Sequence, residues 1–231
     1  MTKAIFITGT GTDVGKTYIS ALLLKKIQEV TTSTAYYKAA MSGNIRQPDN
    51  SLIPGDAAFV QKTAHLKQPL GTMCPYVYET AVSPHLASRL EGHPVELSIV
   101  KEHFYQLTNN YDYLLMEGSG GICCPLDYDS KPLYLENIIQ ELNLTSILVA
   151  DTALGTINNV VLTAFYMKAK KLPLAGIIFN NYHAGNVMEE DNIYMSQQLT
   201  KLAVLAKVEQ GAKTINIETA VLKNIFQEVI L

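Results

Sequence analysis

The sequence predicts an α/β fold in which a doubly wound, mostly parallel sheet is flanked by helices. Short apolar runs, such as "AIFIT" at 4–8 and "SILVA" at 146–150, show no polar alternation, which is typical of strands covered on both faces. Between these runs lie longer stretches with apolar residues at helical spacing. Strands that alternate with helices imply right-handed βαβ crossovers. With no composition shift and no low-complexity linker, we expect one domain over residues 1–231.

The elements follow one another in a regular order along the chain. The expected strands are 4–8, 35–38, 113–117, 146–150, 175–179 and 203–208. The expected helices are 16–29, 56–64, 84–91, 97–108, 155–171 and 188–202. The third helix has a normal start signal, with Ser83 as cap and Pro84 at the first helical position. The polar segment 39–56 contains two prolines and two glycines, and we expect a long loop there.

Composition argues against several classes of function. Hydrophobic residues make up 48% of the chain and charged residues 17%, which favours a folded globular protein. A net charge of −3 argues against nucleic-acid binding, and no apolar run approaches the ~20 residues of a membrane-spanning helix. The apolar start, Ala4 to Ile7, is too short for a secretory signal, so we expect a cytoplasmic protein. Without any C-x-x-C spacing, we expect Cys74, Cys123 and Cys124 to be reduced thiols rather than metal ligands.

The segment "GTGTDVGKT" at 9–17 has the features of a phosphate-binding loop with one irregular position. It lies between the first strand and the first helix, where backbone N–H groups and a helix N-terminus face an anion. Lys16 is placed to reach the β/γ-phosphates and Thr17 to bind Mg²⁺. The usual loop has a glycine where Thr10 stands, and a dinucleotide fingerprint is excluded because Val14 occupies a glycine position. A glycine-rich turn without a ligand is the alternative.

Three charged residues are candidates for the site, and two of them end strands at the edge of the sheet where such folds bind ligands. Glu117 ends a strand before "GSGG" and is either a second Mg²⁺ ligand or a cap of the next turn. Lys38 ends another strand and is either a cation facing a transferred phosphoryl group or a solvated strand end. Asp56 is either a third oxygen ligand or the N-cap of the following helix. Spacing alone leaves these alternatives open.

Taken together, the motifs resemble the dethiobiotin synthetases, a P-loop NTPase-like family of ATP-dependent cyclo-ligases in biotin synthesis. The segment 9–17 matches the family's form G-T-x-T-[DE]-V-G-K-T throughout, including the irregular glycine. The match continues in order through "YYKAAMSG" (36–43), "GDA" (55–57), "SPHLA" (83–87), "EGSGG" (117–121), "LGTINNVVLT" (154–163) and "FNN" (179–181). The resemblance therefore covers nearly the whole chain.

The resemblance implies ring closure of 7,8-diaminononanoate with CO₂ and MgATP to give dethiobiotin, ADP and phosphate. A carbamate forms first, ATP converts it into a carbamic–phosphoric anhydride, and the second amine closes the ring. Lys16 and Lys38 are then the catalytic cations, and Thr17, Asp56 and Glu117 hold Mg²⁺. No biotin prosthetic group is expected.

The same resemblance implies further contacts with these small molecules. The ATP-binding positions are Thr12, Asp13, Val14, Gly15, Lys16, Thr17, Tyr18, Asp56, Glu117, Gly118, Ser119, Gly120, Asn180 and Asn181, with Asn180 on the adenine. Ser42 is expected to hold the amine or carbamate end of the substrate. The family works as a homodimer, in which the substrate's carboxylate binds across the interface to Gly155, Thr156, Asn158 and Tyr194. We expect no nucleic-acid or membrane partner.

The chain departs from the family pattern at three positions. Ala39 and Ser119 replace a proline and an alanine, and Glu209 stands where a proline is common in the nucleotide-base loop. The last departure leaves the base contacts near 208–211 open.

Two other functions remain as alternatives. One is a ParA/MinD-like regulatory ATPase, but such proteins carry an extra lysine near the start of the loop, and this chain lacks it. The other is an amidoligase of the cobyrinate or CTP-synthase type, which needs a glutaminase domain, and 231 residues leave no room for that domain.

Overall fold

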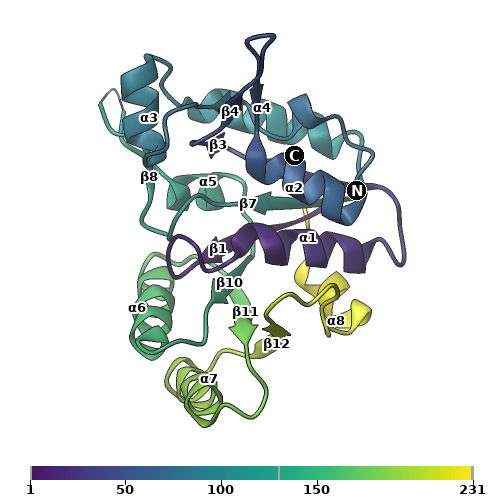
Figure 1. Cartoon of the computed structure of the whole chain (residues 1–231), viewed down its shortest axis with the longest axis vertical. Helices are drawn as coiled ribbons and strands as arrows, with labels where there is room; N and C mark the ends of the chain where they lie inside the picture. Colours follow the sequence, from purple (N-terminus) through teal and green to yellow (C-terminus); the bar gives the residue numbers. More distant parts are fainter. Residues whose placement is uncertain (1, 130, 230–231) are drawn as a thin grey trace.

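A seven-stranded sheet forms the centre of the computed structural model, which describes residues 2–129 and 131–229 (Figure 1). Six strands are parallel and lie in the order β12-β11-β10-β1-β7-β2. Their bounds are β1 Lys3–Gly9, β2 Thr34–Lys38, β7 Tyr113–Glu117, β10 Ser146–Ala150, β11 Leu174–Tyr182 and β12 Val204–Glu209. The seventh strand, β13 (Gln227–Glu228), pairs antiparallel with the start of β1.

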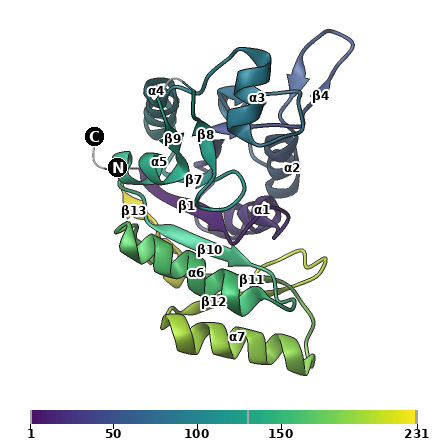
Figure 2. The ribbon, with the colours of Figure 1, turned by 90° about the vertical axis from the view of Figure 1, so that its left-hand side faces the viewer.

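Six short strands form three two-stranded sheets outside the central one. These pairs are β3 (Ala40–Met41) with β6 (Tyr76–Val77), β4 (Ile45–Arg46) with β5 (Leu52–Ile53), and β8 (Pro125–Asp127) with β9 (Leu133–Tyr134). The β4–β5 hairpin projects from the body of the protein in both views (Figures 1 and 2).

Helices cover both faces of the central sheet. One face carries α1 (Lys16–Ile27), α2 (Gly55–Ala64) and α8 (Thr219–Ile225), which share one apolar core with the strands. The other face carries α3 (Pro84–Glu91), α4 (Leu97–Thr108), α5 (Leu135–Glu141), α6 (Thr156–Ala169) and α7 (Val187–Thr200). A short 3₁₀ helix, Leu70–Thr72, follows α2. Figure 2 shows α6 and α7 side by side along β10 to β12.

The central strand β1 explains why the buried runs lack polar alternation. Ile5 and Ile7 belong to the core beneath α1, whereas Ala4 and Phe6 belong to the core beneath α4 and α5. Successive side chains of a strand point to opposite faces, so a strand covered on both faces is apolar at every position. The predicted doubly wound, mostly parallel sheet flanked by helices is therefore confirmed.

All expected strands and helices are present, with ends displaced by no more than three residues. The expectation of one long loop over 39–56 is wrong, because β3, β4 and β5 lie within that segment. The pattern also did not predict α5, α8, β13 or the remaining short strands, since elements this short carry too little periodicity. Within the described residues, no helix is long and apolar enough to cross a membrane.

The register of the sheet brings two charged residues together. Lys38 is the last residue of β2, Glu117 is the last residue of β7, and their Cα positions pair directly. On the other side of β7 lies β1, which ends at Gly9, where the phosphate-binding loop begins. The segments 9–17, 38–43 and 117–121 therefore meet at one edge of the sheet, as ligand-binding segments of open α/β folds do.

Candidate active site

A cavity of ≈ 840 Å³ opens at this edge of the sheet. Its volume lies within the roughly 300–1,000 Å³ that is usual for small-molecule sites. The predicted site residues that line it are Thr12, Asp13, Gly15, Lys16, Thr17, Tyr18, Lys38, Ser42, Asp56, Glu117, Ser119 and Gly120. Residues that are distant in sequence, from the β1–α1 loop, β2, α2 and β7, thus surround one space.

The β1–α1 loop is tightly packed at two of its three glycines. Gly15 precedes α1 with a φ of 89°, and a Cβ there would lie 2.1 Å from the side-chain nitrogen of Asn180. A Cβ at Gly9 would lie 2.9 Å from the Val14 side chain, whereas Gly11 has open space. Only Gly9 and Gly15 must therefore be glycine for steric reasons, and a threonine at position 10 is consistent with this.

Lys16 is the first residue of α1 and is buried at the cavity wall. Its Nζ donates to the carbonyl oxygen of Gly11 over 2.8 Å. Burial, and next the charge of Lys38, lowers the pKa of Lys16 to about 8. An ammonium group and a helix N-terminus face the same cavity, and this combination suits an anionic ligand.

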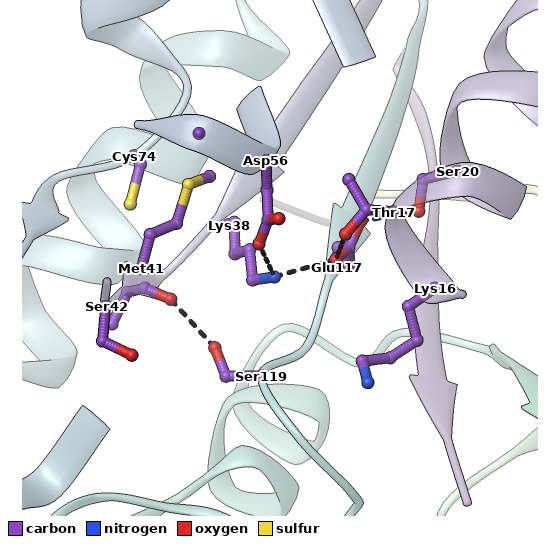
Figure 3. A network of polar contacts seen from close by, with 12 residues as sticks. Lys16, Thr17, Ser20, Lys38, Met41, Ser42, Asp56, Cys74, Glu117 and Ser119 are labelled. Atoms are coloured by element: carbon purple, nitrogen blue, oxygen red, sulfur yellow. Dashed lines mark hydrogen bonds and ion pairs between the residues drawn. The ribbon is translucent and has the colours of Figure 1, made fainter. Parts of the chain in front are cut away.

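Lys38 lies between two carboxylates (Figure 3). Its Nζ is 2.8 Å from Glu117 Oε1 and 2.5 Å from Asp56 Oδ2. Burial by itself would lower the pKa of Lys38, but the charges of Glu117 and Asp56 outweigh it and raise the pKa above the usual value. Lys38 is only 5% exposed, so it is not a solvated strand end. Asp56 is not an N-cap either, because α2 begins at Gly55 and Pro54 holds the cap position.

Glu117 is surrounded by side-chain donors and does not cap the following turn. Thr17 Oγ1 and Lys38 Nζ each donate to Oε1 over 2.8 Å. Ser20 Oγ and Tyr36 OH donate to Oε2 over 2.8 Å and 3.0 Å. Burial, followed by the charge of Glu117, raises the pKa of Tyr36 well above its usual value, so the tyrosine keeps the proton that it donates.

Ser20 and Tyr36 are the two contacts of this network that sequence reasoning missed. Both hydroxyl groups lie in buried stretches without charged residues, "ISALLL" at 19–24 and "AYY" at 35–37. A hydroxyl in a buried stretch needs a hydrogen-bond partner, and that requirement was the only available signal. Nothing in the spacing identifies Glu117 as the partner.

The oxygen atoms around Lys38 suit a hard divalent cation. Thr17 supplies a hydroxyl, while Asp56 and Glu117 supply carboxylates. Burial alone would raise the pKa of Asp56, but the charge of Lys38 outweighs it and lowers the pKa. The described residues contain no group of three or more His, Cys, Asp and Glu side chains that could enclose a metal. Since Mg²⁺ usually takes one or two carboxylates and completes its shell with phosphates and water, the residues fit Mg²⁺ bound together with a nucleotide.

Other side chains line the cavity beyond Lys38. Ser42 Oγ donates to the carbonyl oxygen of Val82 over 2.5 Å. Ser119, which replaces the alanine of the family pattern, donates to the carbonyl oxygen of Ala40 over 2.9 Å (Figure 3). Cys124 also lines the cavity, and burial raises the pKa of its thiol to about 11. All three cysteines of the chain are free thiols.

Four predicted ATP-binding residues do not line the cavity: Val14, Gly118, Asn180 and Asn181. Gly118 is packed against Phe6, where a Cβ would come within 3.0 Å. Asn180 Nδ2 donates to the carbonyl oxygen of Val14 over 3.1 Å, behind the loop. Its Oδ1 is buried and has no hydrogen-bond partner among the residues that the structure describes. Asn181, the next residue, has a left-handed φ of 57°.

The predicted carboxylate-binding residues lie apart from this cavity. Gly155 and Asn158 are exposed at the start of α6, and Tyr194 on α7 is 57% exposed. Thr156 is buried, and its hydroxyl donates to the carbonyl oxygen of Asp151 over 2.8 Å. Within one chain, the structure does not bring these four residues to the cavity wall.

Comparison with known proteins decides which family this geometry belongs to. Residues 3–218 match a family model described as an AAA domain. The chain is 42% identical to the ATP-dependent dethiobiotin synthetase BioD of Brachyspira hyodysenteriae, over 95% of this chain and 99% of that protein. Proteins of the same name from Clostridium botulinum and Clostridium kluyveri are 44% and 45% identical, over 87% and 90% of this chain and 88% and 86% of theirs. The chain belongs to the dethiobiotin synthetase family. The expected enzyme class, an ATP-dependent cyclo-ligase, is therefore confirmed.

Solved structures with much lower sequence identity share the fold. The MinC:MinD cell division protein complex of Aquifex aeolicus gives a TM-score of 0.56 at 12% identity, over 97% of this chain and 87% of that one. A ParA family ATPase from Chlorobium tepidum gives 0.53 at 12% identity, over 90% and 83%. At such identity the likeness establishes the fold alone. The dethiobiotin synthetase assignment rests on 42–45% identity over most of the chain.

Proposed function

We propose that this protein closes the ureido ring of dethiobiotin from 7,8-diaminononanoate, CO₂ and MgATP, releasing ADP and phosphate. One amine and CO₂ form a carbamate, ATP phosphorylates it to a carbamic–phosphoric anhydride, and the other amine displaces phosphate. The observation that carries the proposal is the Lys38 ammonium, held between Asp56 and Glu117 on the wall of the cavity. Two anions, the carbamate and the γ-phosphate, must meet in this reaction, and a preorganised cation stabilises the charge that they concentrate.

The β1–α1 side of the cavity would bind the triphosphate. The N-terminus of α1 and the Lys16 ammonium would neutralise the phosphates. Mg²⁺ held by Thr17, Asp56 and Glu117 would supply further charge neutralisation there. Ser42 would hold the amine or carbamate end of the substrate, and no biotin prosthetic group takes part.

The adenine would bind beside Asn180. The buried Oδ1 of Asn180 lacks a partner among the described residues, and a buried acceptor without a donor is costly. The amino group of adenine is such a donor. Glu209, which stands where a proline is common in the family, is exposed at the end of β12.

We also propose that two copies form a homodimer through α6 and α7. Leu162 and Phe165 on α6 are 60% and 71% exposed, and Val187 and Tyr194 on α7 are 80% and 57% exposed. The two helices lie side by side (Figure 2). Exposed apolar side chains on neighbouring helices are a feature of interaction surfaces. A partner bound there would bring the free N–H groups at the start of α6 to a substrate carboxylate in the neighbouring subunit.

Incubation of the protein with MgATP, bicarbonate and the diamine tests the reaction. We expect dethiobiotin and ADP to form in equal amounts, and omission of the diamine or of bicarbonate should stop both. ATP hydrolysis that continues without the diamine, with no dethiobiotin formed, would contradict ring closure and favour a regulatory ATPase.

A further inference from the structure

Two buried hydroxyl groups hold one oxygen of Glu117. Ser20 on α1 donates to Oε2 over 2.8 Å, and Tyr36 on β2 donates to the same oxygen over 3.0 Å. Both residues are 0% exposed, and neither lines the cavity. A carboxylate carries about four acceptor sites on its two oxygens. The two hydroxyls therefore saturate Oε2.

The other oxygen, Oε1, is held only by side chains that line the cavity. Its donors are Thr17 Oγ1 and Lys38 Nζ. The two oxygens of Glu117 are thus divided between the protein interior and the cavity. Rotation of the carboxylate would break both interior hydrogen bonds and leave two buried hydroxyls unpaired, which is costly. Glu117 can therefore present only Oε1 to a cation in the cavity, where the cation would replace one of the two donors that line it.

We propose that Ser20 and Tyr36 are positioning residues that make Glu117 a one-oxygen metal ligand and thereby favour Mg²⁺ over Ca²⁺. The inference rests on the metal–nucleotide function proposed above. Ca²⁺ takes roughly six to eight oxygens in a flexible geometry that accepts bidentate carboxylates, whereas Mg²⁺ demands near-octahedral geometry with few carboxylates. A carboxylate that is held by one oxygen excludes the bidentate mode, so the restriction acts against Ca²⁺ more than against Mg²⁺.

Binding of a non-hydrolysable ATP analogue at matched free Mg²⁺, at matched free Ca²⁺ and without metal tests this inference. In Tyr36→Phe and in Ser20→Ala, we expect binding with Mg²⁺ to weaken by about 10-fold, the lower end of the effect of outer-shell partners on metal sites. Binding with Ca²⁺ should weaken less, so that the Mg²⁺/Ca²⁺ affinity ratio falls. Binding without metal should not change.

Tyr37→Phe is the matched control for Tyr36→Phe. Tyr37 is the next residue of the same strand and is also 0% exposed, but its hydroxyl donates to the carbonyl oxygen of Val100 on α4, on the opposite face. This variant should keep the wild-type ratio. If Tyr36→Phe does not fold, Ser20→Ala carries the test alone.

Two results would overturn the inference. One is an unchanged Mg²⁺/Ca²⁺ ratio in the folded variants, and the other is an equal change in Tyr37→Phe. Failure of the proposed reaction gives a different result: the wild type would bind the analogue with a preference for Mg²⁺ but form no dethiobiotin. In that case ring closure is wrong, and the assignment of Ser20 and Tyr36 is still decided by the affinity ratios.

Discussion

At the residue scale, Lys16 and Lys38 share one cavity but differ in what surrounds them. Lys38 Nζ contacts two carboxylates, of which that of Glu117 is completely buried, whereas Lys16 Nζ donates to a backbone carbonyl. Removal of either cation should impair phosphoryl transfer. Only removal of Lys38 leaves a buried carboxylate without its ion-pair partner.

We predict that Lys16→Met and Lys38→Met each lower kcat by about 10²–10³-fold, the usual effect of losing one preorganised donor. Lys38→Met should also lower the melting temperature in metal-free buffer, because breaking a buried ion pair costs roughly 3–5 kcal/mol. The loss should be smaller than this range, since the Asp56 side chain is 42% exposed and screened by solvent. ADP release and thermal unfolding measure the two effects. Near-normal turnover in either variant would remove that lysine from the mechanism.

At the scale of elements, the β1–α1 loop is where backbone geometry limits the sequence most. We predict that Gly15→Ala weakens nucleotide binding and lowers stability. A left-handed φ costs a non-glycine residue roughly 1–2 kcal/mol, and the new Cβ would displace the Asn180 side chain. Gly11→Ala is the control, because its Cβ would meet nothing within 4 Å. Equal losses of nucleotide affinity in both variants would refute this account of the loop.

Glu189 of α7 connects the loops that follow β10 and β11 through hydrogen bonds. Its carboxylate accepts from Thr152 Oγ1 and from the backbone N–H of His183, both over 2.8 Å. His183 Nδ1 lies 2.9 Å from Glu189 Oε1, and this hydrogen bond, followed by the charge of Glu189, raises the pKa of His183. The charged imidazole therefore stabilises the folded protein fully below its unfolded pKa of about 6.5. That contribution is lost as the pH rises through the raised pKa.

We predict that His183→Gln lowers the melting temperature more at about pH 5.5 than at about pH 9. Because the His183 side chain is exposed, added salt should reduce the difference. Melting curves of the wild type and of His183→Gln at the two pH values measure this change in melting temperature. Tyr37→Phe is the control, because its effect on the melting temperature should not depend on pH in this range. A loss that is the same at both values would show that the charge of His183 contributes nothing.

The length of an element decides whether the sequence reveals it. Parallel strands of five residues or more form continuous apolar runs, helices of eight residues or more show helical spacing of apolar residues, and all of them were predicted. The register that pairs Lys38 with Glu117 follows from their places at the ends of parallel strands. In contrast, the bonds from Ser20 and Tyr36 to Glu117 span 97 and 81 residues and depend on how α1 and β2 pack against β7. No local pattern encodes such contacts.

At the scale of the whole molecule, the proposed site is divided between two surfaces of the chain. The cavity beside Lys16 and Lys38 would hold the reacting amines, while the start of α6 and Tyr194 lie on a separate, exposed surface. A homodimer would join the cavity of one subunit to the α6 surface of the other. The nine-carbon substrate would then bridge the two subunits, and each active site would need residues from both chains.

Mixing two inactive variants tests this shared site. We predict that Lys16→Ala and the double variant Asn158→Ala/Tyr194→Phe each lose activity alone. In a heterodimer of the two, one site combines both defects and the other has neither, so mixing should restore up to about half of the normal activity per heterodimer. Mixing Lys16→Ala with Lys38→Ala is the control: both substitutions lie on the same half of the composite site, so each heterodimer site keeps one defect and no activity should return. An active monomer at assay concentration, or no recovery in the first mixture despite demonstrated subunit exchange, would show that one chain builds the whole site.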